Sequence, residues 1–131
     1  MKEFDRLVKI VKKLRKECPW DRRQTHKSLR PYMLEETNEA IEAINKRDYI
    51  QLAEELGDQL LHILMHAEIS KTFTVKDIIR HITEKMVRRH PHVFAKKKVR
   101  GVKDVLRNWE AIKKKEDRTR QSGVKLRRNE K

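Results

Sequence analysis

"YIQLAEELGDQLLHILMHAEIS", residues 49–70, carries apolar side chains on two sides of one predicted helix. At helical spacing, the first side holds Leu52, Leu56, Leu60, Ile63, Leu64 and Ala67, and the second holds Leu61, Met65 and Ile69. A helix that is apolar on two sides needs more than one packing neighbour, which either a bundle or a partner subunit supplies. The stretch therefore predicts the central helix of a helical domain, with Asp48 as its N-cap.

Amphipathic segments on both sides of this central helix supply packing neighbours. Apolar residues at helical spacing predict helices over residues 3–16, from a cap at Thr25 or Ser28 to about Ile44, over 74–89, and over 104–116. The chain has only 3 Gly and 3 Pro, and no stretch alternates as a strand would. The prediction is an all-α fold, with a four-helix bundle-like core and a C-terminal helix.

The composition indicates one domain with an anionic partner. A chain of 131 residues accommodates a single core, which we assign to residues 1–117. Residues 118–131 are basic and lack an apolar stripe, so they are expected to form a disordered tail. The formal net charge of +14 predicts a nucleotide, a nucleic acid or an acidic surface as the partner.

The cysteine content and the short apolar runs indicate a compartment. Cys18 is the only cysteine, so no intramolecular disulfide framework is possible. No apolar run is long enough to span a membrane, and no charged-then-apolar leader opens the sequence. We therefore expect a cytoplasmic protein without a membrane partner.

Residues 35–58 gather acidic side chains within this basic chain. Eight Asp and Glu residues stand there against two basic ones. Glu36 and Glu39 are three residues apart on one predicted helix, and Glu55 and Asp58 are three apart on the next, so each pair projects from one face. Carboxylates brought together repel unless a cation neutralises them, and oxygen ligands select Mg²⁺, with Mn²⁺ as a substitute. The alternative reading is an ordinary solvated acidic face.

Gly57 and a basic cluster add to the acidic pattern. Within a helix, Gly57 costs about 1 kcal/mol relative to alanine unless a ligand or backbone approaches closely. Lys85, Arg88 and Arg89 stand at i, i+3 and i+4, and arginine forks suit phosphate oxygens. The same cations are explained equally well if they stabilise the negative end of the helix dipole, at the C-terminus of the predicted helix. Carboxylates holding a divalent ion beside cations would together accommodate a polyphosphate.

Four segments in fixed order extend this reading: CPWDRRQTHKSLRPYMLEETNEAIEAI, LAEELGDQLLHILMHA, ITEKMVRRHPHVF and NWEAIKKKE. Together they resemble the MazG family of nucleoside triphosphate pyrophosphohydrolases over most of residues 4–116. EExxE followed by ExxD is the motif of the all-α NTP pyrophosphatase superfamily, to which that family belongs. Each segment alone is weak, but the four in order are specific.

The resemblance implies an enzyme that cleaves an NTP or dNTP between the α and β phosphates with Mg²⁺, giving NMP and pyrophosphate. It implies Glu36, Glu39, Glu55 and Asp58 as metal ligands, with Glu35 as a second-metal ligand or a water-orienting base. Catalysis would then centre on Glu35, Glu36 and Glu39. The substrate-binding residues would be Tyr32, Lys85, Arg88, Arg89 and Trp109.

Family members assemble as dimers or dimers of dimers, so the resemblance also implies a homodimer or a dimer of dimers here. Two other classes of function stay open from the sequence. One is a basic helical nucleic-acid-binding module that acts through the tail, and the other is a catalytically weak dimeric interaction protein. The presence of every expected ligand favours the enzyme that cleans the nucleotide pool.

Overall fold

The computed structural model describes the backbone of residues 1–129 and the side chains of residues 1–120. Within residues 1–129 it contains seven helices: α1 (Lys2–Glu17), α2 (Pro19–Arg23), α3 (Arg30–Asn45), α4 (Tyr49–Ile69), α5 (Val75–Arg89), α6 (Pro91–Phe94) and α7 (Val102–Asn129). No strand occurs in that range, which confirms the predicted all-α class. None of the described helices is both long and apolar enough to cross a membrane. The chain divides into two compact units, Met1–Lys76 and Asp77–Lys131.

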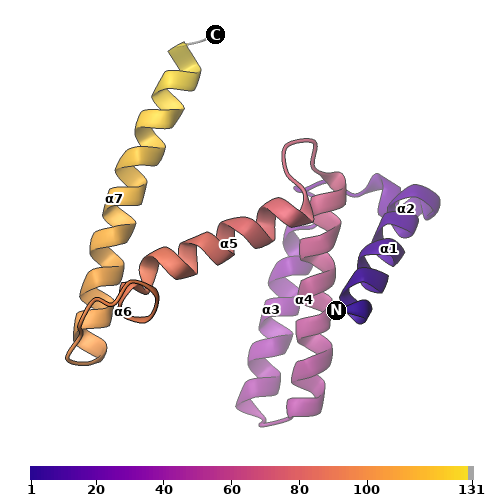
Figure 1. Cartoon of the computed structure of the whole chain (residues 1–131). Coiled ribbons are helices and arrows are strands. Elements are labelled where there is room, and N and C mark those ends of the chain that lie inside the picture. The colour runs from indigo at the N-terminus through magenta and orange to yellow at the C-terminus, as the bar shows by residue number, and fades with distance from the viewer. Residues whose placement is uncertain (130–131) are drawn as a thin grey trace. The chain divides into compact units, whose positions relative to one another are not determined.

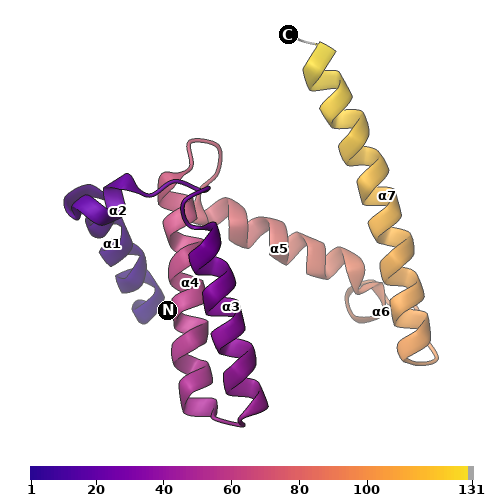
Figure 2. The ribbon, with the colours of Figure 1, turned by 180° about the vertical axis from the view of Figure 1, so that it is seen from behind.

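In unit 1, α4 is the central helix, as its two apolar sides predict. It packs against both α3 and α1, and α3 runs beside it in the opposite direction (Figures 1 and 2). The buried core joins Val11 of α1 and Leu29 to Leu64 and Met65 of α4. The other apolar side of α4 is only partly covered, because Leu56 and Ile63 remain 50% and 43% exposed.

A tight turn sets the alignment of α3 with α4. At the end of α3 the amide of Arg47 donates to the Ile44 carbonyl and the amide of Asp48 donates to the Ala43 carbonyl, both over 3.0 Å. This is the Schellman arrangement, which needs a left-handed residue after the C-cap, and Arg47 supplies it with φ of 57°. Asp48 then caps α4, because its carboxylate accepts the Gln51 amide at 3.1 Å. The predicted N-cap is confirmed.

Two elements differ from the sequence predictions. Pro19–Arg23 forms a five-residue helix, α2, where the pattern predicted a break. Its carbonyl end is closed by the Arg15 guanidinium, whose Nη1 lies 2.6 Å from the Asp21 carbonyl oxygen. The last helix also extends well beyond residue 116, since the backbone of α7 is helical through Asn129 where a disordered tail was expected. Residues 130–131 of that expected tail lie outside the described residues.

In unit 2, α5 and α7 are joined by the side chain of Glu116. Arg88 and Arg89 of α5 both donate to its carboxylate on α7, with Arg89 Nη2 at 2.7 Å from Oε2. Arg89 is buried, and its guanidinium lies 5.1 Å from the centre of the Trp109 ring. His90 meets the same ring edge-on, with ring centroids 5.2 Å apart. Trp109 is thus packed between a cation and an imidazole.

Candidate metal centre

The facing sides of α3 and α4 bring four carboxylates together. Glu36 and Glu39 come from α3, and Glu55 and Asp58 come from α4. Each offers one oxygen, and these four oxygens all lie within 4.8 Å of one another. The i, i+3 spacing places each pair on one side of its helix, and the antiparallel turn at residues 46–48 brings the pairs level. The cluster that the sequence predicted is therefore assembled within one unit.

Two of these carboxylates are buried with an unsatisfied oxygen. Glu55 is 9% exposed, and the Oε2 atoms of both Glu36 and Glu55 are buried without a hydrogen-bond partner among the described residues. A buried carboxylate oxygen without a donor is costly to leave in a folded protein. The observation indicates that a ligand outside the described chain satisfies these oxygens.

Burial and mutual repulsion change the acidity of the cluster. Burial, followed by the negative charge of Asp58, raises the pKa of Glu36 from 4.5 to about 7. A hydrogen bond shared with Glu55 raises the pKa of Glu39, and burial adds to that effect. Without a cation the cluster therefore holds on to protons at neutral pH. A positive ion would reverse this tendency, because it stabilises the charged carboxylates.

A divalent metal ion fits this set of donors. Four carboxylates without Cys or His among them are ligands for a hard cation, since oxygen ligands favour ions of the Mg²⁺ and Mn²⁺ type over zinc. The unpartnered Oε2 atoms of Glu36 and Glu55 are the oxygens that such an ion would satisfy. The structure therefore contains a cluster suited to a metal ion, and the residues that could hold it are Glu36, Glu39, Glu55 and Asp58.

His62 and a small pocket border the cluster, and the sequence predicts His62 as a residue at the edge of the site because it stands four residues after Asp58. The His62 Nε2 atom lies 3.9 Å from Glu36 Oε1, and burial lowers the pKa of its imidazole. Beside it is a cavity of about 280 Å³, lined by Met33, Thr37, Gln59, His62 and Ile63. Gln59 Nε2 donates to the Thr37 hydroxyl at 3.1 Å across the α3–α4 pair. The sequence signal for this pocket was the polar strip of α4 that carries Asp58, Gln59 and His62.

The other predicted residues of unit 1 surround the cluster without joining it. Glu35 is exposed and lies outside the group of four, but its charge contributes to raising the pKa of Glu39. Tyr32, one turn before Glu36, is 40% exposed and meets the Trp20 ring edge-on, with centroids 5.7 Å apart. Their roles in catalysis and substrate binding stay predictions.

The predicted phosphate-binding cations lie in unit 2. Arg88 and Arg89 are both engaged by Glu116, and their hydrogen bonds, with Arg89 as the largest contributor, lower the pKa of Glu116 to about 2. Lys85 is half-buried and makes no ion pair among the described residues. Sequence reasoning missed Glu116, although it stands seven residues after Trp109 and so shares a face of α7 with it. Phosphate binding by these cations remains untested.

Comparison with known proteins agrees with the fold. A model of the MazG nucleotide pyrophosphohydrolase domain matches residues 24–94, which include all four carboxylates. The chain is 47% identical over 115 residues to the nucleoside triphosphate pyrophosphohydrolase/pyrophosphatase MazG of Thermotoga maritima, covering 84% of this chain and 44% of that protein. It is 41% identical over 119 residues to the nucleoside triphosphate pyrophosphohydrolase of Escherichia coli K12, covering 86% and 45%.

Two further similarities define how far the relationship extends. The chain is 50% identical over 127 residues to the uncharacterized protein YabN of Bacillus subtilis, covering 93% of this chain and 26% of that protein. The crystal structure of a MazG-related protein from Thermotoga maritima superposes with a TM-score of 0.70 at 27% identity, covering 84% of this chain and 98% of the other. The chain spans less than half the length of the three curated relatives. Because the domain model covers more than half of it, the chain belongs to the MazG nucleotide pyrophosphohydrolase family.

Proposed function

We propose that this chain is a Mg²⁺-dependent nucleoside triphosphate pyrophosphohydrolase. It would cleave NTPs or dNTPs between the α and β phosphates and release NMP and pyrophosphate. The observation that carries the proposal is the cluster of four carboxylates within 4.8 Å of one another, two of them with a buried, unpartnered oxygen. Membership of a nucleotide pyrophosphohydrolase family gives that cluster its substrate class.

In this mechanism Glu36, Glu39, Glu55 and Asp58 would hold the Mg²⁺, with Mn²⁺ as a substitute. When bound, the ion supplies charge neutralisation at the phosphates and lowers the pKa of water. Glu35, exposed beside the cluster, orients the attacking water or serves a second ion. Lys85 and Arg88 contact phosphate oxygens, where their positive charge stabilises the departing pyrophosphate. Arg89, Tyr32 and Trp109 are the further substrate-binding residues that the family resemblance implies.

The test separates products by anion exchange after incubation with each NTP and dNTP, with Mg²⁺, with Mn²⁺ and with EDTA. The expected result is metal-dependent NMP and pyrophosphate. Glu36→Gln and Asp58→Asn should abolish turnover while leaving the circular dichroism spectrum unchanged. The matched control is Glu42→Gln, which changes a carboxylate on the same helix that pairs with Lys46 at 2.7 Å instead of joining the cluster. Full activity in Glu36→Gln, or intact nucleotides with the unmodified chain, would overturn the proposal.

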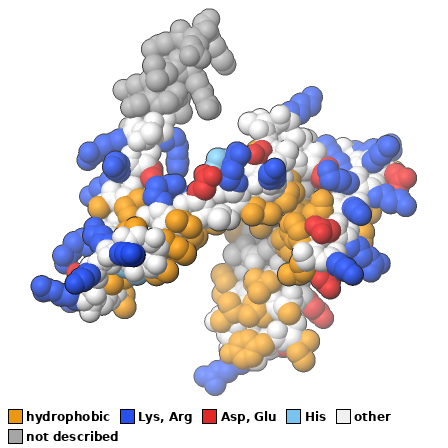
Figure 3. Space-filling view, viewed as in Figure 1, with side chains coloured by type: hydrophobic (Ala, Val, Ile, Leu, Met, Phe, Trp, Pro, Cys, Tyr) orange, Lys and Arg blue, Asp and Glu red, His pale blue; other side chains and the backbone are white. Residues whose placement is uncertain are grey.

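A homodimer, or a dimer of dimers, is the assembly that we propose for this fold. Large apolar side chains remain exposed along the α3–α4 pair, and Figure 3 shows hydrophobic atoms gathered over these helices. They include Leu34, Ile41, Ile44, Leu56 and Ile63, each at least 43% exposed. A second copy would bury this surface, which is too apolar to be favoured in contact with water. Light scattering after size exclusion checks this proposal: Ile41→Glu should give monomers, whereas a monomeric parent chain would contradict it.

A further inference from the structure

The positive charge of the chain is concentrated in unit 2. Residues 77–131 hold 19 of the 34 Lys and Arg residues but only 7 of the 20 Asp and Glu residues, so they carry +12 of the net +14. Unit 1, which contains the carboxylate cluster, is close to neutral at +2. Binding one triphosphate does not require a surplus of this size. The surplus raises the question of whether unit 2 binds another anionic ligand.

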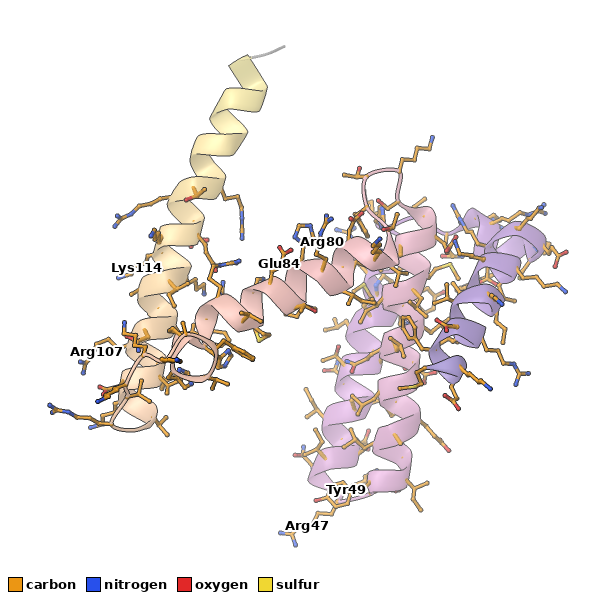
Figure 4. All side chains as sticks on the ribbon, viewed as in Figure 1. Arg47, Tyr49, Arg80, Glu84, Arg107 and Lys114 are labelled. Atoms are coloured by element: carbon orange, nitrogen blue, oxygen red, sulfur yellow. The ribbon has the colours of Figure 1, made fainter. Side chains whose placement is uncertain are left out.

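Exposed cations occupy the α6–α7 connection and one side of α7. At the helical period, Lys103, Arg107, Lys114 and Arg118 fall within an arc of about 60°, on the side of α7 opposite to Trp109 and Ile112. All four are exposed, and Figure 4 shows Arg107 and Lys114 projecting from the same side of the helix. Just before α7 the connection adds four more exposed cations. We call these eight residues the basic surface: Lys96, Lys97, Lys98, Arg100, Lys103, Arg107, Lys114 and Arg118.

Few residues of the basic surface form an ion pair with an acidic residue. Arg107 is the one member of the basic surface with an ion pair among the described residues, and its nitrogen lies 3.8 Å from Asp104. Glu116, which could have neutralised cations on α7, is committed to Arg88 and Arg89 instead. Asp104, Glu110 and Asp117 are the acidic residues closest to the arc, so the eight cations outnumber the three carboxylates near them. In unit 1, by contrast, Lys12 and Lys46 each pair with a glutamate at 3.1 Å or less.

The dimensions and the polarity of this surface identify the class of ligand. From Lys103 to Arg118 the helix rises about 22 Å, which is longer than one triphosphate and matches about six successive phosphates of one nucleic-acid strand. A helix that lies on a membrane needs apolar residues free to enter the lipid. On the described part of α7 the large exposed apolar residues are Val102 and Leu106, both in its first two turns, and Trp109 is packed against Arg89 and His90, so no apolar stripe runs along the basic arc. We propose that the basic surface binds the phosphate backbone of nucleic acid, independently of nucleotide hydrolysis.

The test measures binding of the whole chain to two fluorescein-labelled probes, a 20-nucleotide RNA and a 20-base-pair DNA duplex, by anisotropy in 50, 100 and 200 mM KCl. Dissociation constants of about 10⁻⁶ to 10⁻⁴ M are expected, as for sequence-independent contacts, and they should rise steeply with salt. The variant replaces Lys103, Arg107, Lys114 and Arg118 by glutamate. It should bind at least about tenfold more weakly, and the slope of log K against log salt should fall by about 3 units.

The matched control changes the net charge equally in unit 1, by replacing the exposed Lys9, Lys16, Arg23 and Lys71 with glutamate. It should keep most of the binding and the salt slope. Equal loss in both variants would show that net charge alone attracts the probes, and it would overturn the proposal. Lack of binding by the parent chain, or tighter binding to phosphatidylserine vesicles than to either probe, would also overturn it.

A second variant distinguishes a loss of binding from a folding defect. Glutamine at the same four positions of α7 removes charge without adding repulsion, and it should weaken binding in the same direction with an unchanged melting temperature. NTP turnover should be retained in both α7 variants, because none of the four residues belongs to the proposed catalytic site. If turnover were absent from the parent chain while binding persisted, the enzyme proposal would fail and this one would stand.

Discussion

Glu36 of α3 and Glu55 of α4 face each other across the helix pair, and each keeps its Oε2 atom buried without a hydrogen-bond partner among the described residues. In most folded proteins a polar atom in such a position finds a donor. Here the nearest groups are further carboxylates, which repel it and cannot donate once they are ionised. The pair is therefore a strained arrangement that a cation would relieve, and its strain should depend on pH and on metal.

The first prediction is that Mg²⁺ stabilises the protein more at pH 8 than at pH 5.5. Glu36 has a folded-state pKa of about 7 and an ordinary value of 4.5, so the folded state binds more protons between these values. Stability of the metal-free protein should then fall as pH rises from 4.5 to 7. Above pH 7 the Glu36 carboxylate is mostly charged, and a divalent ion would neutralise it. Melting temperature with MgCl₂ and with EDTA, measured from pH 5 to 8.5, checks this.

Glu36→Gln provides the control for this experiment, because it removes the group with the raised pKa. Most of the pH dependence and most of the metal-induced shift should disappear in this variant. A metal-induced shift that is equal at pH 5.5 and pH 8 would contradict the assignment of the cluster as the binding site.

The second prediction concerns the link between α5 and α7. Glu116→Ala would leave the buried Arg89 without its carboxylate, and the loss of charge-assisted hydrogen bonds should lower the free energy of unfolding by about 2 kcal/mol at pH 7. Urea denaturation measures this loss. Glu110→Ala, at an exposed site on the same helix, is the control and should change stability by less than about 0.5 kcal/mol.

A separate prediction concerns how the stability difference between the parent chain and Glu116→Ala depends on pH. The folded-state pKa of Glu116 is about 2, below its ordinary value of 4.5. Its contribution to stability should be fully present above pH 4.5 and should be lost as pH falls towards 2. The parent chain and Glu116→Ala should therefore converge in stability at acidic pH. A constant difference from pH 7 to pH 3 would show that the residue acts by packing.

Particular residues show what the sequence could predict. Glu36, Glu39, Glu55 and Asp58 were identifiable because helical spacing places each pair on one face, and that geometry is local. The long helices were identifiable for the same reason, since three or more turns give a readable apolar period. The structure confirms both of these geometric predictions.

Structural features that have no apolar periodicity in the sequence were not predicted. The helix α2 has only five residues, which is too short for an apolar period, and Arg15 from another helix closes it. The extension of α7 has no apolar stripe, although Lys, Arg and Gln are good helix formers and propensity alone favours it. Glu116 was missed because its partners, Arg88 and Arg89, are set by packing between two helices. Spacing within one segment carries no information about such a pair.

The fourth prediction is that Gly57→Ala stabilises the fold without blocking metal binding. Gly57 lies within α4 in the same turn as Asp58, and a Cβ atom added there would meet nothing within 4 Å. The expected gain is about 0.5 to 1 kcal/mol, because alanine restricts the unfolded chain and favours helix. Thermal unfolding with and without MgCl₂ measures both effects. A stabilised variant that loses its metal-induced shift would mean that a ligand needs the space beside this glycine.

The last prediction tests the turn that aligns the two halves of the metal cluster. Arg47 adopts φ of 57° at the tip of the α3–α4 turn, labelled in Figure 4, and a left-handed conformation costs a residue with a Cβ about 1 kcal/mol. Arg47→Gly should remove this cost and raise the free energy of unfolding by about that amount. Lys46→Gly, one residue earlier with φ of −82°, should instead destabilise, since glycine there only adds freedom to the unfolded chain. Urea denaturation of both variants distinguishes these outcomes. The turn also fixes how Glu36 and Glu39 meet Glu55 and Asp58, so the stabilised Arg47→Gly variant should keep the rise in melting temperature that Mg²⁺ induces. Destabilisation of this variant would contradict the left-handed turn.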